Sequence, residues 1–129
     1  MNECKIKIMK SVEARQLSSI MNNTKWFELL DGIKKLSFSP PYIYKGVLDN
    51  DTPDLKDMDV SYLGNYEDEI IKPFFAIEWI AVRPRYLKYR GRLISGEIID
   101  ETDAFIDILN TYNIPYELIN GFYVIYGYK

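Results

Sequence analysis

Apolar side chains run along residues 74–82, FFAIEWIAV, interrupted only by Glu78. Successive side chains of an extended segment point to opposite faces, so both faces of this segment are apolar. A strand of this kind normally lies inside a sheet with other elements packed on each side. The pattern therefore predicts a central strand, which Pro84 ends because proline has no backbone N–H to donate.

Glu78 is the only charged residue of that predicted strand. A buried carboxylate loses hydration, so it is paired with a cation, hydrogen-bonded, or shifted to a higher pKa. Glu78 is therefore a candidate general acid or base in a pocket. We favour a structural role, as an ion pair with Arg83 or Arg85 or on a partly wet strand face, because structural networks also perturb carboxylates.

Three segments have apolar residues at helical spacing. The first covers about residues 5–21, and the second runs from Trp26 to a break at residues 37–41, after the cap-forming sequence Asn22-Asn23-Thr24. The third carries apolar residues from Phe105 to Tyr112, with Asp100 as its predicted N-cap.

Further strands are predicted over residues 42–48 and 93–99, and the chain ends in a hairpin around Asn120-Gly121, a dipeptide that suits a two-residue type I′ turn. The face predicted to join the core holds Ile114, Tyr116, Leu118, Tyr123 and Ile125. The face predicted to be wet or to meet a partner holds Glu117, Phe122, Val124, Tyr126 and Tyr128.

These elements predict one α+β domain over residues 1–129. Two N-terminal helices and one later helix pack on a mainly antiparallel sheet of about four to six strands, which ends in the C-terminal β-hairpin. Apolar residues make up 47% of the chain, enough for a real core.

Charge is distributed in blocks along the chain. The net charge of −3 divides into +4 over residues 1–48, −7 over 49–69, +5 over 70–96 and −5 over 97–129. Alternating blocks imply internal pairing or surface patches of opposite sign. The acidic total argues against a general nucleic-acid binder.

The positive block contains a basic segment, RPRYLKYRGR, at residues 83–92. Arginine outnumbers lysine there, and arginine suits bidentate contact with phosphate or carboxylate, while tyrosine can stack on bases. The candidate binding residues are Arg83, Arg85, Tyr86, Lys88, Tyr89, Arg90 and Arg92. The alternative that we favour is a solvated turn that pairs with the chain's own acidic residues.

The acidic segment, residues 49–69, carries eight carboxylates and one lysine. A calcium loop does not fit, because a loop starting at Asp49 places Asp54, and one starting at Asp57 places Tyr62, at the sixth position, where glycine is needed. We expect a long partner-binding loop instead. Its predicted partner-facing residues are Asp49, Asp51, Asp54, Asp57 and Asp59, with Glu67, Asp68 and Glu69 further along.

The sequence lacks residues that several kinds of catalytic, phosphate-binding and metal site require. There is no histidine, and the seven glycines form no phosphate-binding loop. Cys4 is the only cysteine, so no internal disulfide or thiolate metal cluster is expected. We expect no cofactor and no metal site. No secretory or membrane-spanning run is visible, which predicts a cytoplasmic protein that does not bind membranes.

Five short sequences carry a resemblance to a known family: NNTKW at 22–26, DVSYLG at 59–64, IEWIAVRPRYLKYRGRL at 77–93, NIPYE at 113–117 and YGY at 126–128. The chain resembles a family of short bacterial proteins classed as a domain of unknown function, from about Glu13 onward. The resemblance implies a bacterial, soluble, single-domain protein, and it implies no activity or site residues.

Three hypotheses for function follow. The first is a noncatalytic protein-binding module, such as an immunity-type inhibitor of a basic partner, because an acidic loop and abundant tyrosine suit electrostatic steering and aromatic anchoring. The second is binding of phosphate ligands or single-stranded nucleic acid through residues 83–92. The third is a small enzyme that uses Glu78.

Overall fold

The structure is a computed structural model that describes residues 3–66 and 73–129. Glu67, Asp68 and Glu69 of the acidic segment lie outside the described residues. The elements in chain order are α1 (Glu3–Ala14), α2 (Asn23–Lys34), β1 (Tyr42–Gly46), the short 3-10 helix η1 (Phe74–Ala76), β2 (Ile77–Val82), β3 (Arg85–Lys88), β4 (Glu97–Asp100), α3 (Thr102–Thr111), β5 (Glu117–Ile119) and β6 (Phe122–Tyr126). The predicted α+β class, with a mainly antiparallel sheet, is confirmed.

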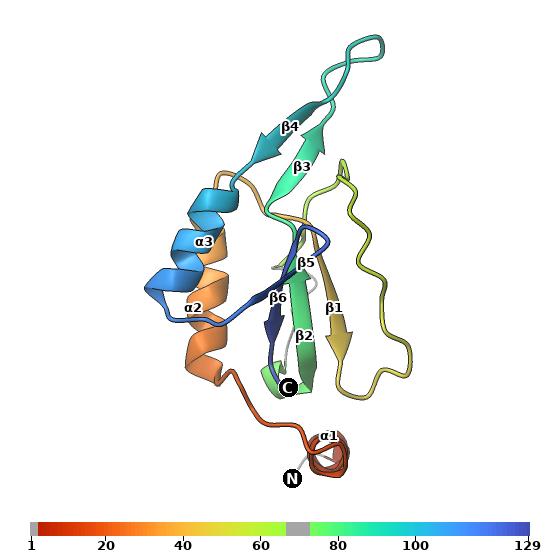
Figure 1. The fold of residues 1–129 in the computed structure, drawn as a ribbon, viewed down its shortest axis with the longest axis vertical. Coiled ribbons are helices and arrows are strands. Elements are labelled where there is room, and N and C mark those ends of the chain that lie inside the picture. The colour runs from red at the N-terminus through yellow and green to blue at the C-terminus, as the bar shows by residue number, and fades with distance from the viewer. Residues whose placement is uncertain (1–2, 67–72) are drawn as a thin grey trace.

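The strand β2 lies inside a four-stranded sheet of order β1-β2-β6-β5, in which every neighbouring pair is antiparallel (Figure 1). The prediction of a central strand is confirmed, although it begins at Ile77 because Phe74–Ala76 form η1. The strand ends at Val82, before Pro84, as expected.

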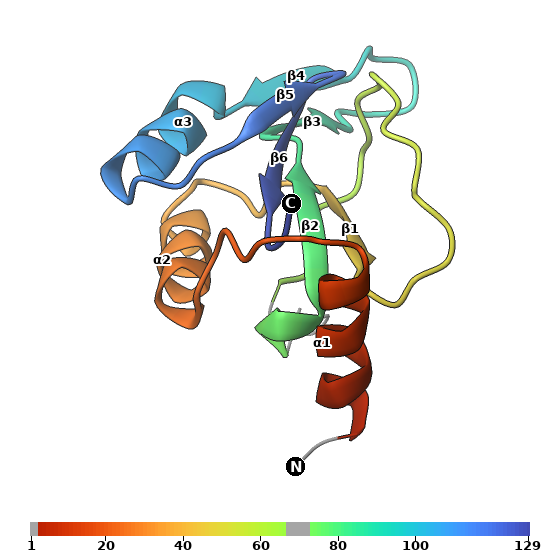
Figure 2. The same cartoon turned by 60° about the horizontal axis from the view of Figure 1, so that its bottom comes forward.

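Different elements cover the two faces of this sheet. Helices α2 and α3 lie together on one face, where Leu29, Phe105 and Leu109 pack on Ile80 and Ile125 (Figure 2). On the other face, a second cluster of Trp79, Ala81, Phe122 and Val124 packs against Leu55 of the acidic segment. Both faces of the central strand are therefore buried, as its apolar pattern requires.

The hairpin β5–β6 has the predicted type I′ turn, with φ of 49° at Asn120 and 78° at Gly121, and Ile119 pairs with Phe122. The predicted wet face is wrong at Phe122 and Val124, which are buried because the acidic segment covers them. It is also wrong at Tyr128, which is buried against Ile8 and Val47. The predicted core face is wrong at Tyr116 and Leu118, which are 41% and 59% exposed, and Leu118 lies on the edge strand β5.

Helix α1 is shorter than predicted. It ends at Ala14 instead of extending to residue 21, because Gln16 takes a left-handed φ of 55° and Ser19 forms a bridge with Tyr128 near the C-terminus. Figure 2 shows α1 beside the η1 end of β2, apart from α2 and α3. Only Ile8 of α1 is buried.

The predicted cap of α2 is present, whereas that of α3 is displaced by one residue, because Glu101 is the N-cap and Asp100 precedes it. Asn22 Oδ1 accepts a hydrogen bond from the Lys25 N–H (2.8 Å), and Asp100 Oδ1 accepts one from the Thr102 N–H (2.7 Å). These side chains satisfy backbone donors that have no partner inside the first turn of a helix.

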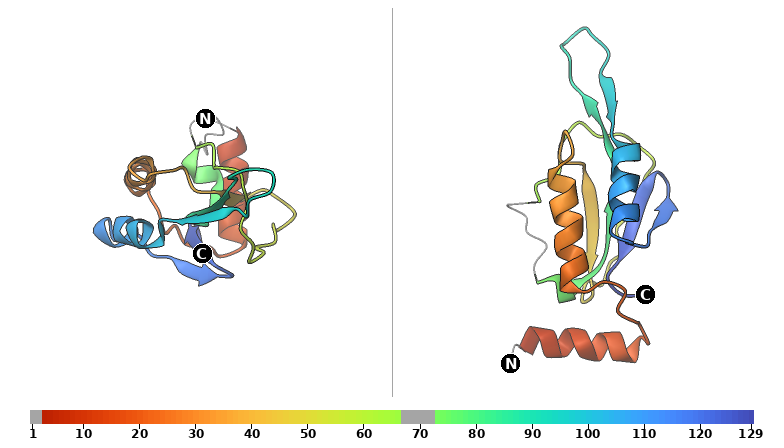
Figure 3. Two further views of the ribbon diagram at one scale, coloured as in Figure 1. Left: turned by 90° about the horizontal axis from the view of Figure 1, so that it is seen from above. Right: turned by 90° about the vertical axis from the view of Figure 1, so that its left-hand side faces the viewer.

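Of the strands that the structure describes, β3 and β4 pair only with each other, and they form an arm, defined here as residues 85–100, which projects beyond the sheet (Figures 1 and 3). A turn at 83–92 was expected, whereas Arg85–Lys88 form a strand. The strand predicted from Leu93 begins only at Glu97. The intervening residues of the arm make its distal loop.

Candidate functional site

The base of the arm is defined here as Arg83 and Arg85 together with their partners Asp57 and Asp59. Arg83 is its buried centre, with only 4% of its surface exposed. Its Nε lies 3.0 Å from Asp59 Oδ1 and its Nη2 lies 2.9 Å from Asp57 Oδ1. Its Nη1 donates to the backbone carbonyl of Asn120 (3.1 Å), and its guanidinium lies 5.7 Å from the centre of the Phe122 ring. Arg83 therefore joins the acidic segment to the C-terminal hairpin.

Arg85 shares the same carboxylate. Its Nε and Nη2 each lie 2.7 Å from an oxygen of Asp59, and its Nη1 lies 3.7 Å from Asp100 Oδ2. Hydrogen bonds from Arg85 and then from Arg83 lower the pKa of Asp59 below its usual value, although burial acts in the opposite direction. This carboxylate is therefore held ionised at neutral pH.

The turn at Gly121 forms a wall of the base. A Cβ atom at this position would collide with Arg83 Nη1, and the φ of +78° also disfavours any side chain. Glycine is thus required both for the turn geometry and for the close approach of the guanidinium. The sequence signal for a hairpin turn was clear, but its contact with Arg83 was not visible.

The tip of the arm, defined here as residues 88–94, is largely exposed to solvent, whereas Arg83 at the base is buried. Leu93 is 98% exposed and Tyr89 is 73% exposed, and Ile94 is also exposed. Within residues 3–66 and 73–129, no ion pair involves Lys88, Arg90 or Arg92, and Arg90 Nε donates only to the backbone carbonyl of Ser95 (2.9 Å). The tip therefore presents apolar groups and available cations together.

The seven basic-segment candidates are thus separated into two groups. Arg83 and Arg85 pair with the protein's own carboxylates, whereas Lys88, Tyr89, Arg90 and Arg92 point into solvent at the tip. Tyr86 lies at the boundary between the two groups, because it is half-buried and the centre of its ring lies 4.7 Å from the centre of the Phe38 ring. Binding by any of these residues stays a prediction.

The acidic-segment candidates are also separated. Asp49 Oδ2 accepts from the Gly46 N–H (2.7 Å), and Asp57 and Asp59 pair at the base of the arm. Asp51 and Asp54 are exposed, and neither forms an ion pair in the part of the chain that the structure describes. These two remain available for a partner.

Glu78 is part of an ion-pair network, but its partners differ from those expected. Its Oε1 lies 2.6 Å from Arg15 Nη1 and 2.9 Å from the buried Lys45 Nζ, whereas Arg83 and Arg85 pair elsewhere. The pairing register shifts at this point, since Lys45 faces Trp79 and Gly46 faces Ile77, which leaves Glu78 as an extra residue. Sequence alternation alone did not show this bulge.

The network determines the protonation of Glu78. Burial alone would raise the pKa of the carboxyl, but hydrogen bonds from Arg15 and Lys45 outweigh it and lower the pKa below its usual value. A carboxylate that two cations hold ionised is a poor proton acceptor and a poor proton donor at neutral pH. This arrangement favours the structural role of Glu78.

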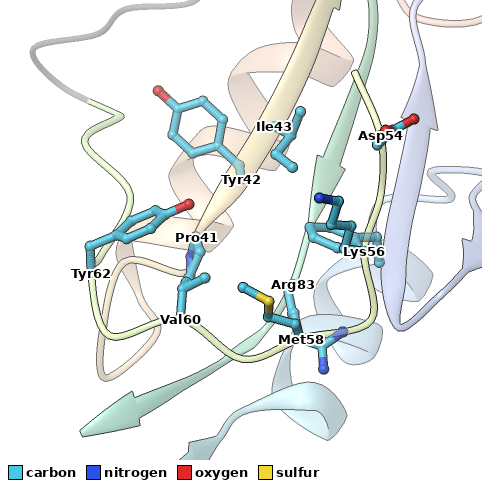
Figure 4. Close-up of a pocket in the computed structure, with 10 residues that line it drawn as sticks. Pro41, Tyr42, Ile43, Asp54, Lys56, Met58, Val60, Tyr62 and Arg83 are labelled. Carbon is cyan, nitrogen blue, oxygen red and sulfur yellow. The ribbon is translucent and has the colours of Figure 1, made fainter. Parts of the chain in front are cut away.

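A pocket of about 180 Å³ lies between β1 and the acidic segment (Figure 4). Pro41, Tyr42 and Ile43 line its sheet side. The acidic segment contributes every second residue to the opposite side: Asp54, Lys56, Met58, Val60 and Tyr62. Sequence analysis missed this site, although a two-residue alternation of side-chain type would have indicated an extended segment.

The residues that alternate with these pocket-lining residues of the acidic segment point away from the pocket. Leu55 packs on the second face of the sheet, and Asp57 and Asp59 meet Arg83. The segment is therefore extended, with one set of side chains against the body and the base and the other set lining the pocket.

A model of a family of unknown function, DUF6678, matches residues 8–129. The chain belongs to this family. The match extends from the middle of α1 to the last residue and confirms the predicted near full-length resemblance to a family without known activity. No curated protein and no solved structure matches this DUF6678 chain. A bacterial origin stays a prediction.

Over residues 3–66 and 73–129, no helix has the length and apolar character needed to cross a bilayer. In the same described ranges, no three His, Cys, Asp or Glu side chains are grouped so that they could hold a metal ion.

Proposed function

We propose that this DUF6678 protein is a noncatalytic protein-binding module that docks through the tip of its arm. The observation that carries the proposal is the almost complete exposure of Leu93 beside Tyr89 and Ile94 on a projecting hairpin. One exposed leucine is ordinary on a protein surface, but three apolar side chains within a short distal loop form a patch.

The chemistry of the tip favours a protein as the partner. Tyrosine and arginine are the residue types that most often contribute strongly to protein–protein interfaces, and the tip contains Tyr89, Arg90 and Arg92. Leu93 and Ile94 require apolar cover that phosphates do not offer. The partner surface that fits is an apolar pocket with carboxylates around it.

This partner surface is acidic, whereas the acidic segment suggested a basic partner. Asp57 and Asp59 are already paired with arginines of this chain, and so Asp51 and Asp54 are the remaining acidic-segment candidates among the described residues. An immunity-type role in a bacterium stays a prediction, and in that role the tip would contact an acidic surface of the enzyme to be inhibited.

The uncovered hairpin also suits docking on energetic grounds. A two-stranded hairpin is at best marginally stable by itself, and among the described residues no third strand pairs with this arm. The backbone hydrogen bond from the Leu87 N–H to the Val60 carbonyl (2.7 Å) attaches it to the body near its base. A partner that covers the tip would order the distal loop as it binds.

Site-specific photocrosslinking tests the proposal. A photoreactive phenylalanine replaces Leu93 in one protein and Leu118 in a control, since both are exposed and Leu118 lies on β5, outside the arm. In native cells, position 93 should capture a discrete protein that position 118 does not. With the purified partner, Arg90→Glu with Arg92→Glu should weaken binding at least about tenfold.

Two results would contradict the proposal. Capture of the same proteins from both positions, or unchanged affinity of the doubly charge-reversed variant, would show that the tip is not the docking site. Titration with single-stranded RNA and DNA at low and moderate salt tests the alternative: tight binding that weakens steeply with salt would replace protein docking by phosphate binding at Lys88, Arg90 and Arg92.

A further inference from the structure

The pocket beside β1 combines an apolar interior with two charged groups at its rim. Pro41, Ile43, Met58, Val60 and Phe122 supply apolar surface. Its volume of about 180 Å³ is slightly larger than the ~150 Å³ cavities that accommodate benzene. The pocket therefore suits one ring or one branched aliphatic side chain, and it is too small for a folded segment of a partner.

The two rim charges are of opposite sign. Lys56 and Asp54 lie two residues apart on the extended segment, so their side chains project from the same side of it. In the described residues neither forms an ion pair. Figure 4 shows the amine of Lys56 pointing across the pocket, with Asp54 on the same wall.

Arg83, the third charged residue that lines the pocket, already has partners within the protein. Its guanidinium pairs with Asp57 and Asp59 and donates to the Asn120 carbonyl, and in Figure 4 it points away from the Lys56 amine. Tyr62 adds a hydroxyl to the lining. The charges available to a ligand are therefore one cation and one anion beside an apolar interior.

We propose that this pocket binds a free apolar amino acid as its zwitterion. The side chain fills the apolar interior, Lys56 pairs with the α-carboxylate, and Asp54 pairs with the α-ammonium. A simple carboxylic acid would leave Asp54 facing an anion, and a simple amine would leave Lys56 facing a cation. A zwitterion is the small ligand that satisfies both rim groups at once.

The proposal is tested with four probes: L-phenylalanine, N-acetyl-L-phenylalanine, L-phenylalaninamide and glycine. Binding is followed by calorimetry and by amide chemical shifts of the pocket residues. Phenylalanine should bind and shift amide resonances of residues 42–43 and 54–62. Each singly charged derivative should bind about fivefold more weakly, the upper range for one exposed ion pair, and glycine should not bind detectably.

Charge-removing variants assign each contact. Lys56→Met should bind phenylalanine and phenylalaninamide equally, because the contact to the carboxylate is gone. Asp54→Asn should likewise no longer distinguish phenylalanine from its N-acetyl derivative. Lys34→Met and Asp51→Asn are the matched controls at exposed positions outside the pocket, and they should leave all four affinities unchanged.

A variant that fills the pocket locates the site. Met58 is exposed, so Met58→Trp should leave the fold intact while occupying the apolar interior, and phenylalanine binding should be lost. The proposal is overturned if phenylalanine shifts no pocket resonances, if Met58→Trp binds as tightly as the wild type, or if N-acetylphenylalanine matches phenylalanine in the unmodified protein.

Discussion

The two ends of the basic segment are both rich in cations but have opposite surroundings. At the base, Arg83 and Arg85 hold Asp57 and Asp59 at distances below 3.1 Å, with Arg83 buried. At the tip, Lys88, Arg90 and Arg92 are exposed and form no ion pair within the described ranges. A run of like charges in a sequence thus supplies structural ion pairs at one end and available cations at the other.

The difference has an energetic consequence. Buried charges have lost their hydration, so removing one partner leaves the other uncompensated, whereas exposed charges remain hydrated after a neighbour is removed. Substitutions at the base should therefore change stability, and substitutions at the tip should change binding alone. Four predictions test this separation, from the largest expected effect to the smallest.

Arg83→Ala should have the largest effect. It removes the contacts to two carboxylates and to the Asn120 carbonyl and leaves Asp59 partly buried, so the free energy of unfolding should fall by about 3 kcal/mol. Urea denaturation measures the loss. Arg90→Ala, the matched control, should stay within about 0.5 kcal/mol of the wild type. Equal losses for the two variants would contradict the separation.

Asp59→Asn should lower the free energy of unfolding by about 2 kcal/mol at neutral pH, because Arg83 and Arg85 lose their shared carboxylate. Since the folded-state pKa of Asp59 is lowered, its stabilisation is fully present above the unfolded-state pKa of about 3.9. It is lost as pH falls through the lower folded-state value. The difference from the wild type should therefore stay constant down to about pH 4 and shrink below it.

The control for this second prediction is Asp54→Asn, since Asp54 is exposed and has no ion pair among the described residues. It should change stability little at any pH. Urea denaturation of all three proteins across the acidic range provides the measurement. A difference between wild type and Asp59→Asn that grows as the pH falls would show that Asp59 is not held ionised.

Tyr86→Ser tests the boundary between base and tip. The ring of Tyr86 packs on Phe38, so its removal should cost about 1 kcal/mol from the aromatic contact, measured by thermal or urea unfolding. Tyr89→Ser at the exposed tip is the matched control and should cost less than about 0.5 kcal/mol. A larger cost at Tyr89 would place it in a packed environment.

Leu93→Ser should have the smallest effect on stability, within about 0.5 kcal/mol, because the side chain is almost fully exposed. The tip amides should also exchange with solvent through local opening, whereas those of β2 and β6 should require global unfolding. Native-state hydrogen exchange measures both the change in stability and the protection of these amides. Strong protection of residues 89–96 in the isolated protein would show that the distal loop is more stable than its contacts imply.

Much of the fold was predictable because it depends on local pattern. The two apolar faces of FFAIEWIAV indicated a central strand, and Asn120-Gly121 indicated the turn that pairs Ile119 with Phe122. The candidate site was less predictable, since which of its seven basic-segment residues find internal partners depends on contacts between segments far apart in sequence. The bulge at Glu78 and the pocket between β1 and the acidic segment arise in the same way.

The sequence by itself determined the class of the fold, the central strand, the cap of α2 and the turn, because periodicity, proline and glycine act over a few neighbouring residues. Only the tertiary structure decided that Asp57 and Asp59 neutralise Arg83 and Arg85, and that Leu93 remains in solvent. The physical reason is that ion pairing and burial depend on which distant segments meet. No local pattern along the chain contains that information.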